Sequence, residues 1–147
     1  MQLSLHADYS LRVLIYLGTH RGEVVTTGSI SKAYGISKNH LVRVMHTLGE
    51  HGYVDLIPGR SGGVRLKRAP EDIRLGQVVR DAEPNMRLVE CFDMKTNTCP
   101  IAAVCGLQKH LDSALEAFLR ELDRFTLDQL LTPNRRKDLA AVFVQLR

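Results

Sequence analysis

The 147-residue sequence has no tryptophan, only three cysteines and 5% aromatic residues. It also lacks any run of about 18 consecutive apolar residues, the length that a membrane-spanning helix requires. Its first residues, MQLSLHADYSLRVLIYLG, have no basic segment ahead of an apolar one, so they do not resemble a secretory signal. We therefore expect a cytoplasmic protein without membrane contact, whose thiols stay reduced or bind a metal.

The sequence also lacks the residue patterns of common catalytic sites. It contains no glycine-rich phosphate loop, no pair of carboxylates near its cysteines and no recognisable arrangement of Cys, His and Asn or Asp. We therefore predict that the protein is not an enzyme.

The excess of basic residues is confined to the first half of the chain. Residues 1–80 carry 11 Lys and Arg against 6 Asp and Glu, a net charge of +5, whereas residues 81–147 carry 9 against 10, a net charge of −1. This asymmetry indicates a nucleic-acid-binding half followed by a regulatory or assembly half.

Two short helices joined by a glycine turn are predicted within the basic half. The first spans residues 26–35 and ends at Gly35, and Ser37 is suited to cap the second, residues 38–51. The second helix has one apolar face at helical spacing, formed by Leu41, Val44, Met45 and Leu48. This order is typical of a helix-turn-helix.

A β-hairpin is predicted directly after the second helix. Residues 53–57 and 64–66 have strand composition, and the turn-rich segment 58–63 connects them. The fold class predicted is therefore mainly α with a small β-hairpin wing, a winged helix-turn-helix DNA-binding domain followed by a long dimerisation helix.

The exposed polar residues of this unit are the predicted DNA contacts. Asn39 can pair with an adenine edge, and Lys38 or Arg43 with a guanine edge or a phosphate. Arg60, in the Gly-Arg-Ser-Gly-Gly tip of the wing, can enter a minor groove. The full set of candidates is Thr27, Ser29, Ser37, Lys38, Asn39, His40, Arg43, Arg60 and Ser61.

Further helices are expected at residues 4–20, 70–84, 101–125 and 126–131 and after Pro133. The longest has apolar residues spaced 4, 4, 3, 4 and 3 apart from Leu107 to Phe125. We interpret this seam as a homodimer interface, which would present two recognition helices to a pseudo-palindromic operator. The predicted domains are a DNA-binding domain at residues 1–83, a cysteine loop at 84–106, and the dimerisation helix with the C-terminal helices at 107–147.

The three cysteines, Cys91, Cys99 and Cys105, lie within one short segment. Their spacing lacks the Cys-x2–4-Cys pair with which zinc knuckles usually begin, and it also lacks the redox pair Cys-x-x-Cys. Three thiolates suit an iron–sulfur cluster, which tolerates irregular spacing but needs a fourth ligand. Zinc and unliganded or redox-regulatory thiols remain alternatives. The candidate fourth ligands are an external small molecule or Asp8, His6, Glu90, Asp93 and His110.

The segments DYSLRVLIYLG, ISKNHLVRV, GYVDLIPGRSGGVRL, LVECF and CPIAAVCGL resemble the iron–sulfur winged-helix regulators of the Rrf2 family. The similarity covers roughly residues 1–131. The GRSGGVRL wing and the cysteine segment are its most specific motifs.

The resemblance implies a homodimeric repressor with one cluster per subunit, held by Cys91, Cys99 and Cys105. In the nitric-oxide-sensing members an aspartate from the first helix of the other subunit completes a [4Fe–4S] site, and the matching residue is Asp8; [4Fe–4S] is therefore favoured over [2Fe–2S]. Cluster nitrosylation or loss then releases the operator. Other members use a histidine three residues beyond the last cysteine, where this chain has Gln108. A regulator that senses iron or cluster supply is the alternative.

Overall fold

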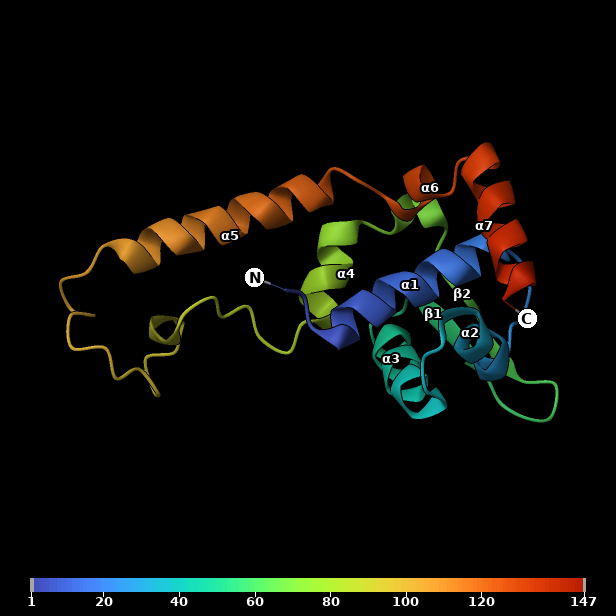
Figure 1. Cartoon of the computed structure of the whole chain (residues 1–147), viewed down its shortest axis with the longest axis horizontal. Helices are drawn as coiled ribbons and strands as arrows, with labels where there is room; N and C mark the ends of the chain where they lie inside the picture. Colours follow the sequence, from blue (N-terminus) through green and yellow to red (C-terminus); the bar gives the residue numbers. More distant parts are fainter. Residues whose placement is uncertain (1, 147) are drawn as a thin grey trace.

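A computed structural model describes residues 2–146, and it is mainly helical with one two-stranded antiparallel sheet (Figure 1). The predicted fold class, a helix-turn-helix with a hairpin wing, is confirmed. The elements are α1 (Leu5–Thr19), α2 (Thr27–Tyr34), α3 (Lys38–Glu50), β1 (Val54–Ile57), β2 (Gly63–Leu66), η1 (Pro70–Asp72), α4 (Leu75–Ala82), η2 (Glu90–Phe92), α5 (Leu107–Asp123), α6 (Leu127–Leu130) and α7 (Pro133–Gln145).

The first three helices begin at hydroxyl caps, as the sequence indicated for α2 and α3. The side chains of Ser4, Thr26 and Ser37 each accept a hydrogen bond from a backbone N–H in the first turn of their helix. Gly35 ends α2 with φ of +65°, a conformation that glycine adopts without a steric cost. These caps set the turn between α2 and α3.

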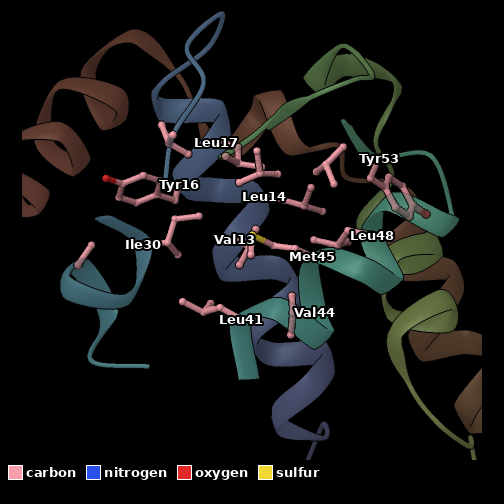
Figure 2. Packing of buried hydrophobic residues seen from close by; sticks show 14 of the residues in the cluster. Val13, Leu14, Tyr16, Leu17, Ile30, Leu41, Val44, Met45, Leu48 and Tyr53 are labelled. Atoms are coloured by element: carbon pink, nitrogen blue, oxygen red, sulfur yellow. The ribbon is translucent and has the colours of Figure 1, made fainter. Parts of the chain in front are cut away.

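The hydrophobic core lies where α1 crosses α3 and the hairpin (Figure 2). We call α1, α2, α3 and the hairpin, residues 5–66, the reading head. The four residues predicted to face inward from α3 are all buried. They pack against buried side chains of α1, namely Val13, Leu14 and Leu17.

The hairpin is held to the segment that precedes α2 by backbone hydrogen bonds. Its register runs from Val54 opposite Leu66 to Ile57 opposite Gly63. Val64 also exchanges two backbone hydrogen bonds with Val25, the residue that precedes α2. The wing is therefore anchored beside the helix-turn-helix.

Helix α4 lies between the reading head and α5 (Figure 1). Val78 packs into the core of the reading head, and its neighbour Val79 packs with Leu115 and Leu119 of α5. Both valines are fully buried. Consecutive residues of one short helix therefore belong to two separate hydrophobic clusters.

Helices α6 and α7 return to the reading head after α5. Phe143 of α7 is buried against Tyr16 and Tyr34, at ring-centroid distances of 4.8 and 5.4 Å. Arg136 donates a hydrogen bond to the carbonyl of Thr19 at the end of α1. The C-terminal helix thus covers the far end of α1.

Several helix boundaries differ from those predicted. The segment 70–84 divides into the 3-10 turn η1 and helix α4, and α5 begins at Leu107 instead of Ile101 and ends at Asp123. Residues 101–104 form separate turns, in which the N–H groups of Val104 and Cys105 both donate to the carbonyl of Ile101.

None of the helices within residues 2–146 combines the length and apolar composition needed to cross a bilayer.

Candidate DNA-reading surface and cysteine site

The outward face of α3 carries the predicted base-reading residues. Lys38, Asn39, His40 and Arg43 are all exposed. Ser37 is exposed at the start of the helix, and its hydroxyl accepts from the N–H of His40 at 3.3 Å. The first two turns of α3 therefore present two cations, an amide and an imidazole to solvent, a combination suited to base edges and phosphates.

The start of α2 lies beside this face. Thr27 and Ser29 are both half-buried, and the hydroxyl of Ser29 donates to the carbonyl of Thr26 at 2.7 Å. The side chain of Lys38 passes over Gly28, so its charge lies close to the first turn of α2. A cavity of about 410 Å³ opens here between α2, α3 and the wing.

The wing tip is exposed, as predicted. Arg60 and Ser61 lie in the turn between β1 and β2, which Gly59 makes possible with φ of +100°. The body of the hairpin carries a cross-strand ion pair between Asp55 and Arg65 at 3.3 Å. Arg60 is thus available to a partner.

Sequence reasoning missed one residue of this surface, Val42, whose side chain is 55% exposed on α3. Its position outside the buried pattern of the helix was the available signal. An exposed aliphatic side chain on a recognition helix suits contact with a thymine methyl group.

The cysteines lie far from this surface, in the segment that links α4 to the start of α5 (Figure 1). We call residues 84–114 the cysteine arm. Cys91 lies in η2, Cys99 follows a turn whose Asn97 side chain accepts from the Cys99 N–H, and Cys105 precedes α5. All three are free and partly exposed.

Asp8 is in the first turn of α1, away from the cysteines of its own chain. Its carboxylate forms an ion pair with Arg12 at 2.7 Å, and its side chain is 38% exposed. The structure of one chain therefore does not bring Asp8 and the three thiols together. Its exposure leaves the carboxylate accessible to a second molecule.

The other candidate ligands differ in how they are engaged. Nε2 of His6 lies 3.1 Å from the Thr47 hydroxyl, and Glu90 accepts from the Thr98 hydroxyl. Hydrogen bonds from the backbone of Lys95 and the hydroxyl of Thr96 lower the pKa of Asp93. Only His110, exposed on α5, has no such contact among those found in residues 2–146.

The cysteine arm fits an iron–sulfur cluster in its donor chemistry. It offers three free thiols and no competing disulfide, and thiolates are the usual protein ligands of such clusters. Within residues 2–146, however, no group of three or more His, Cys, Asp and Glu side chains is arranged to hold a metal ion.

Comparisons with known proteins match nearly the whole chain to one family of transcriptional regulators. A family model described as Rrf2, iron-dependent transcriptional regulator, matches residues 3–133. The HTH-type transcriptional regulator NsrR of Bacillus subtilis is 50% identical over 132 residues, covering 89% of this chain and 90% of that protein. NsrR of Bacillus licheniformis is 47% identical over 132 residues, covering 89% and 92%.

Solved structures show the same architecture. A transcriptional regulator from Listeria innocua superposes with a TM-score of 0.69 at 27% identity, covering 89% of this chain and 86% of that one. IscR from T. potens superposes with a TM-score of 0.70 at 23% identity and the same coverage, a likeness of fold alone. The family match over 131 of 147 residues, together with relatives at 50% and 47% identity, shows that the chain belongs to the Rrf2 family of DNA-binding transcriptional regulators.

Proposed function

We propose that the protein is a homodimeric repressor that releases operator DNA in response to nitric oxide. In this proposal Cys91, Cys99 and Cys105 hold an iron–sulfur cluster, with Asp8 of the partner subunit as the fourth ligand. The observation that carries it is the placement of three free thiols on an arm without buried side chains, joined to a winged helix-turn-helix. When bound, the cluster supplies iron that binds nitric oxide, and a carboxylate is a weaker ligand to it than a thiolate.

A groove beside the cysteine arm supports the dimer. It has a volume of about 680 Å³ and lies between α4, α5 and the segment 85–89. Its apolar lining includes Leu3, Met86, Leu88, Leu111 and Phe118. A second copy would cover this surface from water, which is the main favourable contribution to stable homodimers.

Exposed apolar residues at the end of the arm support the same interface. Ile101 and Leu107 are each 56% exposed and Val104 is 87% exposed. Contiguous exposed apolar surface in a small protein marks an interaction site. In a symmetric dimer the same residues of both copies would be covered at once.

In the proposed dimer, the fourth ligand would connect the DNA-reading part of one subunit to the cysteine segment of the other. Asp8 lies on α1, which crosses α3 in the reading head, whereas the cysteines lie on the arm. Ligation across the interface would connect the reading head of one subunit to the arm of the other. Release of Asp8 would free its carboxylate for Arg12 of its own chain, the pair that the structure shows, and would change the separation of the two recognition helices.

The proposal is tested with anaerobically prepared protein by visible absorption, sedimentation and operator binding. Cys99→Ala should abolish the visible absorption, and Thr98→Ala, the exposed neighbouring position, should retain it. Operator affinity should be high for loaded protein and fall on adding nitric oxide. Equal operator affinity of loaded and metal-free protein, or affinity unchanged by nitric oxide, contradicts the mechanism.

Sensing of iron supply is the second candidate, because the matching family model is described as iron-dependent. The loaded protein would then release the operator when iron is withdrawn. Titration with an iron chelator, in parallel with nitric oxide, separates the two signals. A colourless, zinc-containing protein that binds the operator equally well would exclude both.

A further inference from the structure

Helix α4 is fixed to α5 by polar contacts as well as by Val79. Arg80 donates two hydrogen bonds to the carboxylate of Asp123, at 2.9 and 2.8 Å. Arg74, just before α4, donates to the backbone carbonyl of Asp123 at 2.7 Å. Gly76 leaves no space between the helices, because a Cβ there would come within 2.6 Å of the Leu119 carbonyl oxygen. These contacts make α4 and the C-terminal half of α5 one unit.

Asp81 is the α4 residue that forms hydrogen bonds to the reading head. Its Oδ2 accepts from the hydroxyl of Tyr53 at 2.6 Å and lies 3.5 Å from Nδ1 of His51. Its Oδ1 accepts from Gln77 of the same helix at 2.8 Å, which fixes the rotamer of the carboxylate. The Asp81 side chain is only 19% exposed, and its hydrogen bond with Tyr53 is partly buried, which strengthens that bond.

The residues that contact Asp81 connect the end of the recognition helix to the base of the wing. His51 is the C-cap of α3, and the N–H of Tyr53 donates to the carbonyl of Leu48 in its last turn. Arg68, just after β2, donates to the carbonyl of His51 at 2.7 Å and lies over the ring of Tyr53 at 4.5 Å. Tyr53 itself is 1% exposed, at the edge of the core (Figure 2).

We propose that Asp81 is a positioning residue that transmits movement of α5 to the recognition helix and the wing. The cysteine arm includes the first turns of α5, and the C-terminal half of α5 is joined to α4 by the pair of Arg80 and Asp123, so a shift of the arm displaces Asp81. Because Asp81 accepts a hydrogen bond from Tyr53, just before β1, and lies 3.5 Å from His51, at the end of α3, its displacement tilts the two DNA-contacting elements together. This inference rests on the proposed effector-dependent release of DNA.

The measured quantity is the coupling ratio, the operator Kd after nitric oxide divided by the Kd of the loaded protein. Allosteric coupling in proteins is typically about 5- to 150-fold. Substitution of a residue that only stabilises the fold lowers the melting temperature and leaves this ratio unchanged. Substitution of a residue that transmits the signal lowers the ratio itself, so the two roles are distinguishable.

We expect Asp81→Ala to keep the visible absorption and its response to nitric oxide, but to reduce the coupling ratio to near 1. Tyr53→Phe removes the same hydrogen bond with a smaller structural change, and it should lower the ratio in the same direction if Asp81→Ala folds poorly. Asp55→Ala is the matched control, because its carboxylate pairs with Arg65 within the hairpin. That variant should retain the wild-type ratio.

Hydrogen exchange provides a readout independent of DNA. Removing iron from wild-type protein should change the exchange of the backbone amides at the C-terminal end of α3, residues 48–53, and Asp81→Ala should abolish that change. Wild-type coupling in both Asp81→Ala and Tyr53→Phe would overturn the role of Asp81 while leaving the proposed function intact. If neither nitric oxide nor iron removal changes the operator affinity of the wild-type protein, the proposed function is overturned instead.

Discussion

The reading head and the cysteine arm are stabilised in opposite ways. The reading head places side chains such as Val13, Leu14 and Leu41 at 0% exposure, whereas no side chain of the arm, residues 84–114, is buried. Burial of apolar surface is the main term that offsets the conformational entropy lost on folding. The reading head therefore has a stabilising core of its own, and the arm has none.

This difference suits a sensor. A segment without a core of its own can change conformation at little cost to the rest of the fold, because local stability follows local burial. The DNA-reading surface needs a fixed geometry to match a groove. Helix α4 lies between the two and shares one buried valine with each hydrophobic cluster.

The largest expected difference in unfolding free energy is between alanine substitutions of two leucines, Leu14 in the reading head and Leu107 in the arm. Leu14→Ala should lower the unfolding free energy of metal-free protein by about 3 kcal/mol, because Leu14 is fully buried. Leu107→Ala should change it by less than about 0.5 kcal/mol, because Leu107 is 56% exposed. Urea unfolding at a concentration that keeps the protein monomeric measures both.

The proposed dimer allows the complementary measurement, that of self-association. Leu107→Ala should weaken self-association in sedimentation experiments, whereas an exposed apolar residue away from the arm, Val144, should tolerate the change to alanine. Equal losses of unfolding free energy in Leu14→Ala and Leu107→Ala would contradict the division into two regions.

The sequence predicts the reading head well because periodicity and local caps determine it. The buried set of α3 follows helical spacing, and Ser37 and Gly35 mark the turn before it. Periodicity is less informative where a helix has only a few contacts. Leu5 of α1 and Val142 of α7 fit apolar stripes, but their side chains are 57% and 49% exposed.

The arm and α5 are where sequence reasoning is limited. The apolar seam from Leu107 to Phe125 predicts an interface, but half of it packs within the chain. Leu115, Phe118 and Leu122 belong to the hydrophobic cluster that Val79 of α4 joins. Spacing along the chain does not reveal that tertiary contact. Prediction of the cysteine site is limited for another reason. The proposed ligand set is shared between subunits, and no local sequence pattern indicates how two subunits are arranged.

Gly76→Ala tests the joint between α4 and α5. A Cβ at this position would come within 2.6 Å of the Leu119 carbonyl oxygen, a backbone atom that can move only if α5 moves. Such overpacking should lower the unfolding free energy by about 2 kcal/mol. Gly106→Ala is the control, because a Cβ there meets no heavy atom within 4 Å. Similar losses in the two variants would contradict a close α4–α5 contact.

Two ion pairs that arginines form with carboxylates of α5 give a smaller expected difference in stability. The pair between Arg80 and Asp123 has side chains 29% and 30% exposed, whereas the pair between Arg124 and Glu121 has side chains 73% and 56% exposed. Arg80→Ala should lower the unfolding free energy by about 1 kcal/mol, and Arg124→Ala should stay within about 0.5 kcal/mol of wild type. Thermal melts at low and high salt check this, and salt should diminish the smaller effect more.

The smallest expected effect is alkaline destabilisation, which should originate in the reading head alone. All four tyrosines lie at or before residue 53. Burial raises the pKa of Tyr34 and Tyr53 above the ordinary value of 10.0, and the hydrogen bond to Asp81 raises that of Tyr53 further. Both phenols then remain protonated in the folded state at a pH where the unfolded chain has begun to ionise.

The stability that these two groups contribute is therefore fully present below about pH 10 and is lost as the pH rises above it. The loss per tyrosine should be below about 1 kcal/mol at half a pH unit above that value. Urea unfolding between pH 9 and 10.5 measures the slope, and Tyr53→Phe should flatten it by removing one ionisable group. An unchanged slope in Tyr53→Phe would mean that this phenol ionises as readily in the folded protein as in the unfolded chain. That outcome would in turn weaken the case for a strong hydrogen bond to Asp81 and for its role in connecting the two regions.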